Sequence, residues 1–188
     1  MTHRPSPLLW LSHTVTDYTG HPPSRIRLAI AGLILATGLL TQDDPVTTIV
    51  IAVLAPGLVA LALIDADIRR LPDRILLPLY PLAAAVLIPA GIWTNAPEAL
   101  LRAAATSAAA LLGYAILCAA TGAIGFGDVK LAGLLGLITG WVGWSATLLA
   151  TTAAMLLGAI HGLIVLSRNR SNRTIPYGPH LITTLLLI

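Results

Sequence analysis

Long apolar segments with short polar interruptions are the feature that most restricts how this chain can fold. A helix rises 1.5 Å per residue, so about 20 apolar residues cross the ~30 Å hydrocarbon core of a membrane. Lipid favours helices because a helix pairs its own backbone polar groups. The first four apolar segments cover about residues 26–41, 46–64, 75–93 and 98–120. The sequence therefore predicts an all-α, polytopic bundle of membrane-spanning helices.

The composition of the chain supports this prediction. Of the 188 residues, 56% are hydrophobic and 10% are charged, whereas soluble domains carry roughly 25% charged residues. The formal net charge is +3. The basic residues lie in loops beside apolar segments, so we interpret them as topology signals at a lipid bilayer and expect no nucleic acid partner. Cys118 is the single cysteine, which excludes an intrachain disulfide and a cysteine-based zinc site.

The apolar stretch from Lys130 to Leu166 is too long for one span. Its centre, Gly140 to Trp144, reads GWVGW. Glycines interrupt helices, and tryptophans are typical of the headgroup level, so this motif predicts a turn between two spans. A further apolar segment begins at Ile175 and predicts a short last span. We therefore expect about six to seven transmembrane helices.

Residues 1–24 differ from the rest of the chain. They are polar and rich in proline, serine, threonine and histidine. We expect them to form a loosely ordered, polar cytoplasmic tail, followed by a membrane domain at residues 25–188.

Charge asymmetry predicts the orientation of the bundle. Alternating spans bring nine basic residues to one face: Arg25, Arg27, Arg69, Arg70, Arg74, Lys130, Arg168, Arg170 and Arg173. The opposite face receives Asp43, Asp44, Glu98 and Arg102. Loops rich in lysine and arginine stay in the cytoplasm. The basic face is therefore expected to be cytoplasmic in a multi-pass protein of the inner (plasma) membrane.

Two acids are expected to meet on that basic face. Asp65 closes the second apolar segment, and Asp128 opens the fifth. Carboxylates at membrane depth are costly and usually mark function. Two carboxyls that share a site do not both ionise easily, so one keeps a proton. The ionised carboxyl can then take a proton from an attacking water, and the protonated one can polarise a peptide carbonyl and protonate the leaving nitrogen.

Glycines precede the second acid, in the order Gly125, Phe126, Gly127, Asp128. Glycine permits close backbone approach, which suits an enzyme that holds an extended peptide beside its acids. A helix N-terminus also stabilises a carboxylate. The bland alternative for Asp128 is a helix cap at a loop, and the alternative for Asp65 is an interfacial acid at a helix end.

Three motifs together resemble the prepilin peptidase family (type IV leader peptidases), which are intramembrane aspartyl proteases of the GxGD type. The first motif is an aspartate, six residues, then proline and an acid or amide, here Asp65 with Pro72 and Asp73. The second is Gly-x-Gly-Asp-x-Lys, here Gly125 to Lys130. The third is IPYGPHL, here Ile175 to Leu181. The resemblance covers roughly residues 46–188.

The resemblance implies a function and a site. It implies that Asp65 and Asp128 are the catalytic pair of an endopeptidase, without a metal or organic cofactor. Its substrate would be a prepilin or pseudopilin, cleaved after a glycine at the cytoplasmic edge of the hydrophobic stem. Larger members carry a cytoplasmic insert with paired CxxC motifs that is linked to N-methylation. Because Cys118 is alone, we expect a compact peptidase for Flp/Tad-like or competence-type pilins, with residues 25–188 as the peptidase domain.

Several residues near the motifs have more than one interpretation. Asp67 is an alternative acid, although on a helix it points away from Asp65. Asp73 is expected to be a structural cap rather than a catalytic group. Lys130 is expected to stabilise the ionised pair, to contact lipid phosphate or to act as an interfacial anchor. We include Gly125, Gly127 and Lys130 as substrate-binding candidates.

Two other functions fit part of the pattern. Asp65 and Asp128 could instead couple proton or cation movement in a small transporter. The chain could also be a non-catalytic scaffold of a pilus assembly machine. The sequence does not determine an oligomeric state.

Overall fold

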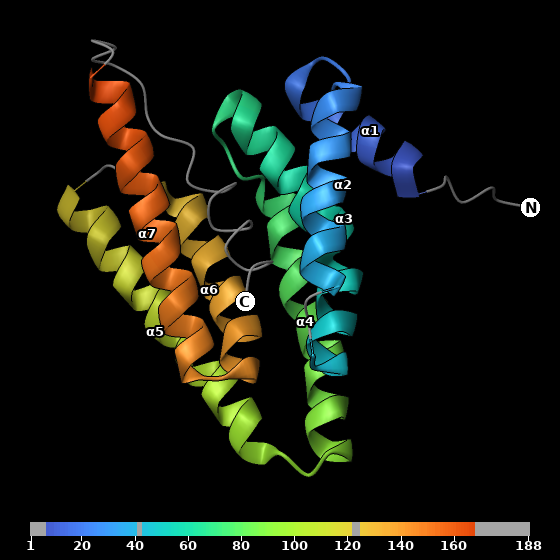
Figure 1. Cartoon of the computed structure of the whole chain (residues 1–188), viewed down its shortest axis with the longest axis vertical. Helices are drawn as coiled ribbons and strands as arrows, with labels where there is room; N and C mark the ends of the chain where they lie inside the picture. Colours follow the sequence, from blue (N-terminus) through green and yellow to red (C-terminus); the bar gives the residue numbers. More distant parts are fainter. Residues whose placement is uncertain (1–6, 41–42, 122–124, 168–188) are drawn as a thin grey trace, which may run out of the picture.

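All the regular structure that the computed structural model describes is α-helical. It describes residues 7–40, 43–121 and 125–167. This part of the chain forms seven helices (Figure 1): α1 Pro7–Thr19, α2 Arg25–Leu40, α3 Pro45–Ile68, α4 Asp73–Trp93, α5 Pro97–Thr121, α6 Phe126–Val142 and α7 Trp144–Ser167. The predicted all-α helical bundle is confirmed.

The predicted spans match these helices to within a few residues. The long apolar stretch divides at Gly143, which caps α6 through an N–H donated to the Thr139 carbonyl at 3.0 Å. The predicted turn within GWVGW is therefore confirmed. The expected last span after Ile175 lies outside the described residues.

Three of the described helices are long and apolar enough to cross a membrane. They are α3, α4 and residues Pro97–Ala120 of α5. Within α7, Trp144–Leu156 forms a shorter apolar helical segment. These helices make the chain a multi-pass membrane protein.

The prediction of a loosely ordered tail is wrong for residues 7–19, which form α1. Leu11 and Val15 lie four positions apart, so they share one face of a helix. Both are buried, and α1 packs against α3. The polar composition of residues 1–24 concealed this short apolar stripe, because a helix needs only one apolar face to pack.

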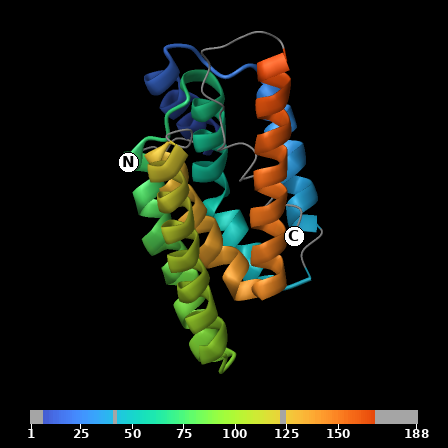
Figure 2. The same ribbon diagram turned by 90° about the vertical axis from the view of Figure 1, so that its left-hand side faces the viewer.

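Helices α2 to α7 alternate in direction (Figures 1 and 2), so alternate connections gather at the same end of the bundle. At one end, Arg27 at the start of α2 forms an ion pair with Asp67 at the end of α3. At the opposite end, the indole nitrogen of Trp141 in α6 donates to Asp44, which precedes α3, at 3.0 Å. The end that holds Asp67 also holds Asp65 and Asp128, and we call it the acid end.

The core consists of two closely packed helix pairs. One pair is α3 with α4, and the other is α5 with α6. In the second pair, Thr106 donates to the Gly136 carbonyl at 2.7 Å, and Ser107 donates to the Gly133 carbonyl at 2.8 Å. A Cβ at Gly136 would lie 2.8 Å from the Thr106 carbonyl oxygen. Small residues allow such close approach between membrane helices.

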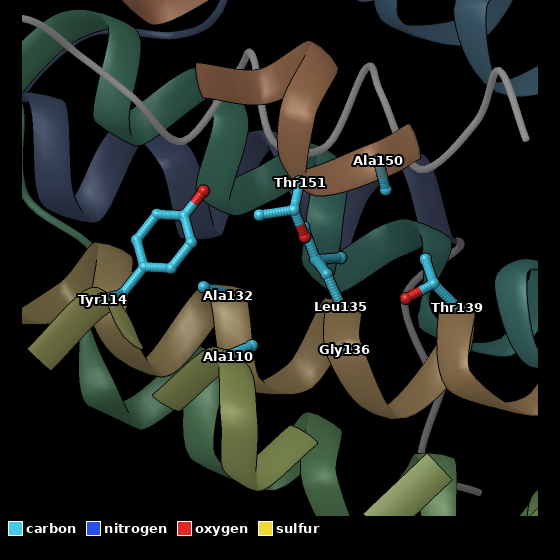
Figure 3. A pocket seen from close by; sticks show the side chains of 8 residues that line it. All are labelled: Ala110, Tyr114, Ala132, Leu135, Gly136, Thr139, Ala150 and Thr151. Atoms are coloured by element: carbon cyan, nitrogen blue, oxygen red, sulfur yellow. The ribbon is translucent and has the colours of Figure 1, made fainter. Parts of the chain in front are cut away.

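A small cavity of about 20 Å³ lies between α5, α6 and α7 (Figure 3). Its polar lining comes from Tyr114, Thr139 and Thr151. This volume holds about one water molecule. Neither Asp65 nor Asp128 lines it, so this cavity is separate from the candidate site.

Candidate active site

Asp65 lies in the last turn of α3 and is 4% exposed. The preceding Ile64 and Leu61 are fully buried, so this end of α3 reaches the acid end through apolar packing. The helix stops four residues later because Arg69 adopts a left-handed conformation, with φ 54°. The Arg69 N–H donates to the Asp65 carbonyl at 2.9 Å. The chain therefore leaves α3 one helical turn after the buried acid, and α4 begins at Asp73.

Asp128 lies in the first turn of α6 and is 8% exposed. One carboxylate oxygen, Oδ2, accepts a hydrogen bond from the Gly125 N–H at 3.1 Å. In a complete capping box, the N-cap side chain also accepts a hydrogen bond from the backbone N–H of the third helical residue. The N-cap residue here is a glycine, so only the bond from its N–H to the Asp128 side chain can form. The other oxygen, Oδ1, is buried and has no hydrogen-bond partner among the described residues. The capping explanation therefore accounts for only one of the two oxygens.

The two acids interact across the contact between α3 and α6. These helices pack against each other, and the negative charge of Asp65 acts on the carboxyl of Asp128. Electrostatic interactions between buried groups are stronger than those in water. The structure thus places both predicted catalytic residues at the same end of the bundle, both buried and electrostatically coupled.

The two glycines before Asp128 have different surroundings. A Cβ at Gly127 would lie 2.8 Å from the Cβ of Leu71, in the connection between α3 and α4. Gly127 therefore lets this connection approach α6 closely. Gly125 is exposed, and among the described residues beyond its chain neighbours the one atom within 4 Å of its Cβ position is Oδ2 of Asp128, at 3.2 Å. Gly125 leaves room beside the acid, whereas Gly127 is already covered by the protein itself.

Lys130 and Asp73 pair with each other. The Lys130 ammonium donates to both carboxylate oxygens of Asp73, at 2.7 and 2.8 Å, and lies 5.2 Å from the centre of the Phe126 ring. Asp73 is the first residue of α4, and the N-cap position belongs to Pro72. The sequence-based prediction that Asp73 caps the helix is therefore wrong, and its side chain instead holds the lysine of the second motif.

The alternative acid, Asp67, has a cationic partner. Its Oδ1 pairs with Arg27, while Oδ2 is buried without a hydrogen-bond partner among the described residues. Sequence reasoning did not find this pairing, because nothing in the chain indicates which helix lies beside the end of α3. Asp67 is thus neutralised by an arginine, and the structure shows no such ion pair for Asp128 within the described part of the chain.

Tyr80 is a second residue that sequence reasoning missed. Its hydroxyl donates to the Lys130 carbonyl at 2.6 Å. Tyr80 follows Asp73 by seven positions, or two helical turns, so both residues lie on the same face of α4. That spacing was a usable signal once Asp73 had been singled out.

The arrangement has the requirements for acid–base hydrolysis. It combines two coupled carboxyls, one carboxylate oxygen without a hydrogen-bond partner in the described part of the chain, and a glycine that leaves the adjacent backbone accessible. Among the described residues, no group of three or more His, Cys, Asp or Glu side chains is placed to hold a metal ion.

Comparison with known proteins defines the class. The model of the type IV leader peptidase family matches residues 52–163, which contain both Asp65 and Asp128. This match covers more than half of the chain, and the chain belongs to that family. No solved structure matches it.

Similar curated proteins have a consistent name. A prepilin leader peptidase/N-methyltransferase of Pseudomonas putida is 36% identical over 140 residues, which are 72% of this chain and 47% of the relative. The protein of that name from Pseudomonas aeruginosa is 37% identical over 136 residues, or 66% and 43% of the two chains. The one from Burkholderia pseudomallei strain 1026b is 32% identical over 164 residues, or 82% and 50%. The chain spans about half the length of these curated relatives.

Proposed function

We propose that this protein is an intramembrane aspartyl endopeptidase that removes the leader peptide from prepilins or pseudopilins. Asp65 and Asp128 are the proposed catalytic residues. The observation that carries the proposal is the buried Asp128 carboxyl, which has one unpartnered oxygen among the described residues and is coupled to a second buried acid. Asp67 also has a buried oxygen without a hydrogen-bond partner among the described residues, but its other oxygen pairs with Arg27. Asp128 has no such cationic partner among the described residues, so its unpaired oxygen is the one that the fold leaves uncompensated.

The proposed reaction is general acid–base hydrolysis. The ionised member of the pair takes a proton from water, and that water attacks the scissile carbonyl. The protonated member polarises the carbonyl oxygen and then gives a proton to the leaving nitrogen. The two carboxyls titrate as a unit, so either can take either role. The chemistry needs no metal or organic cofactor.

The substrate backbone would approach past the start of α6. Gly125 is exposed beside Asp128, so an extended segment can come close to the acids there. Gly127 and Lys130 belong to the same turn. We propose that they shape the substrate-binding site without touching the substrate, because Leu71 covers Gly127 and Asp73 holds Lys130. Phe126 is 64% exposed and presents an apolar surface next to this turn. The hydrophobic stem of the substrate would reach it from the surrounding lipid.

We place the acid end at the cytoplasmic face of the inner membrane. The support is the positive-inside rule, since Arg69, Arg70 and Arg74 lie in or beside the connection between α3 and α4. Cys118 is the single cysteine of the sequence, so these 188 residues hold no paired CxxC motifs, and we propose Flp/Tad-like or other type IV pilin precursors as the substrates. Cleavage is expected after a glycine at the edge of the precursor's hydrophobic stem.

Co-expression with a candidate prepilin tests this proposal. The wild-type protein should convert the precursor into a shorter product whose new N-terminus, read by mass spectrometry, follows a glycine. Asp65→Asn should leave the precursor intact, whereas Asp17→Asn, at an exposed aspartate of α1, should cleave normally. An ion flux in liposomes without any cleavage would favour a transporter. Unchanged pilus assembly with both catalytic aspartates replaced would favour a scaffold.

A further inference from the structure

We infer that Asp73, Tyr80 and Lys130 form a clamp between α4 and α6 that sets the position of Asp128 relative to Asp65. This inference rests on the proposed function and adds three positioning residues to it. We refer to these three residues as the α4–α6 clamp.

The need for such a clamp follows from how the helices pair. Asp65 belongs to α3, whose main partner among the later helices is α4, while Asp128 belongs to α6, whose main partner is α5. The two acids therefore sit in different helix pairs. A small shift of one pair against the other would separate them, since a misplacement of about 1 Å can cost about 100-fold in rate. Contacts between α4 and α6 resist that shift.

The clamp holds one residue at two points. The side chain of Lys130 donates to both oxygens of Asp73, at 2.7 and 2.8 Å. Its backbone carbonyl accepts the Tyr80 hydroxyl at 2.6 Å. Lys130 lies two residues after Asp128 in the same helix. Because both the backbone and the side chain of Lys130 are held, the first turns of α6 resist sliding along the helix axis and rotating about it. The position of Asp128 is held with them.

The other side of the clamp leads to Asp65. Asp73 begins α4 directly after the short connection from α3, and Leu71 in that connection packs closely against Gly127. The Arg69 N–H in the same connection donates to the Asp65 carbonyl. A continuous series of described contacts thus runs from Asp65 through the connection to α4, and from α4 to the helix that carries Asp128.

The ion pair is too exposed to be explained by stability alone. The Asp73 side chain is 54% exposed and that of Lys130 is 24% exposed, and pairs of this kind contribute little to folding. Loss of the pair should therefore leave the bundle folded while releasing the start of α6. Direct substrate binding by Lys130 is the competing explanation, and it predicts a change in KM.

A double-mutant cycle distinguishes these explanations. Asp73→Asn, Lys130→Met and the double variant are compared with the wild type in steady-state cleavage of a purified prepilin, using the full chain in lipid nanodiscs. The clamp predicts that each single variant lowers kcat by up to about fivefold, as expected for the loss of an exposed ion pair, with KM within about twofold. The double variant should be no slower than the slower single one, because the two residues act through one contact.

Conservative and remote variants serve as controls. Lys130→Arg keeps the charge and should retain more activity than Lys130→Met. Tyr80→Phe removes only the bond to the Lys130 carbonyl and should lower kcat less than loss of the ion pair. Glu98→Gln changes an exposed acid in the first turn of α5, at the opposite end of the bundle, and should have no effect. All variants should unfold at the wild-type temperature.

A second measurement does not depend on cleavage. Hydrogen exchange of the first turn of α6, where the Asp128 N–H donates to the Gly125 carbonyl at 3.0 Å, should be several-fold faster in Asp73→Asn and Lys130→Met than in the wild type. Unchanged exchange, an unchanged kcat, a raised KM alone, or additive losses would each overturn the clamp. An inactive wild type with faster exchange in these variants would overturn the proposed function and leave the clamp supported.

Discussion

Asp44 and Asp128 both lie at the start of a helix, at opposite ends of the bundle, yet their surroundings differ. Asp44 caps α3 and accepts hydrogen bonds from the Thr47 N–H at 2.9 Å, the Thr47 hydroxyl at 2.5 Å and the Trp141 indole at 3.0 Å. Asp128 accepts one from Gly125, and its other oxygen is buried without a partner among the described residues. The first acid is satisfied by the fold, whereas the second retains an oxygen available for chemistry.

The comparison supports a structural role for Asp44 and the catalytic role that we propose for Asp128. Hydrogen bonds to a carboxylate stabilise its charged form and tie it to the helix that it caps. A buried carboxyl oxygen that lacks such bonds costs free energy and needs an explanation. For Asp128 that explanation is the proposed chemistry, whereas Asp67, which also has such an oxygen, is paired with Arg27 through its other one.

The largest effect is expected at Asp128 itself. Asp128→Asn removes a proposed acid–base group, so the rate of cleavage should fall by about 10²- to 10⁴-fold or more. The matched change Asp44→Asn should leave the rate per folded molecule within about twofold. Initial rates on purified prepilin, normalised to folded protein, measure both. A strong loss of cleavage rate in folded Asp44→Asn protein would contradict the assignment of a purely structural role to Asp44.

Two glycines extend the comparison to packing. Gly127→Ala forces a Cβ to within 2.8 Å of Leu71, at the acid end, and should lower kcat by about 10- to 100-fold through displacement of Asp128. Gly140→Ala forces a Cβ onto the side chain of Thr106 and to within 2.8 Å of the Ala103 Cα, at the other end. It should destabilise the protein by about 1–3 kcal/mol without a change in kcat.

Gly113→Ala is the control for both glycine changes, because no atom of the described residues outside its own stretch of helix lies within 4 Å of its Cβ position. It should leave kcat unchanged and should not lower the unfolding temperature, since alanine favours a helix over glycine. Loss of stability alone in Gly127→Ala, or loss of activity alone in Gly140→Ala, would contradict the assignment of catalysis to the acid end.

A smaller effect is expected from removal of the cap. Asp44→Ala deletes the acceptor for Thr47 and Trp141 and should destabilise the protein by about 1 kcal/mol. The catalytic rate of the folded fraction should stay the same. Thermal unfolding in detergent, followed by helical circular dichroism, measures the loss. An unfolding temperature equal to that of the wild type would show that this cap is dispensable.

The smallest expected effect is a change in how the free energy of unfolding depends on pH. Burial opposes ionisation of Asp44, but hydrogen bonds from Thr47, Trp141 and Val46 outweigh it and hold the pKa of Asp44 below its ordinary value of 3.8. The stabilisation is therefore complete above that ordinary value and is lost as pH falls through the lowered pKa of the folded protein. In Asp44→Ala, the free energy of unfolding should fall less steeply at low pH than it does in the wild type. An identical pH dependence in both proteins would contradict the assignment.

Sequence reasoning predicted the helices of the bundle and its pair of acids for identifiable reasons. Apolar length determines where a membrane helix begins and ends, so the spans could be placed. Alternation of the spans brings Asp65 and Asp128 to one end, and acids are rare enough in the chain for the pair to be noticeable. Both inferences depend on length and order along the chain.

Sequence reasoning missed the contacts that depend on the orientation of each helix about its axis and on which helices pack together. The pairing of Lys130 with Asp73, and that of Arg27 with Asp67, joins residues far apart in the chain. An apolar helix shows little preference for one face, because lipid and protein interior both accept leucine and alanine. The small stripe on α1 was hidden for a related reason, since two buried residues do not alter the composition of a polar segment.

We propose that Asp65 and Asp128 act as one catalytic unit. The most direct test is the cleavage rate of Asp65→Asn, Asp128→Asn and the double variant on the same prepilin, each verified as folded by its unfolding temperature. Residues that work as a unit have non-additive effects, so all three variants should show the same residual rate. Wild-type cleavage by either single variant, while its protein remains folded, would contradict the account.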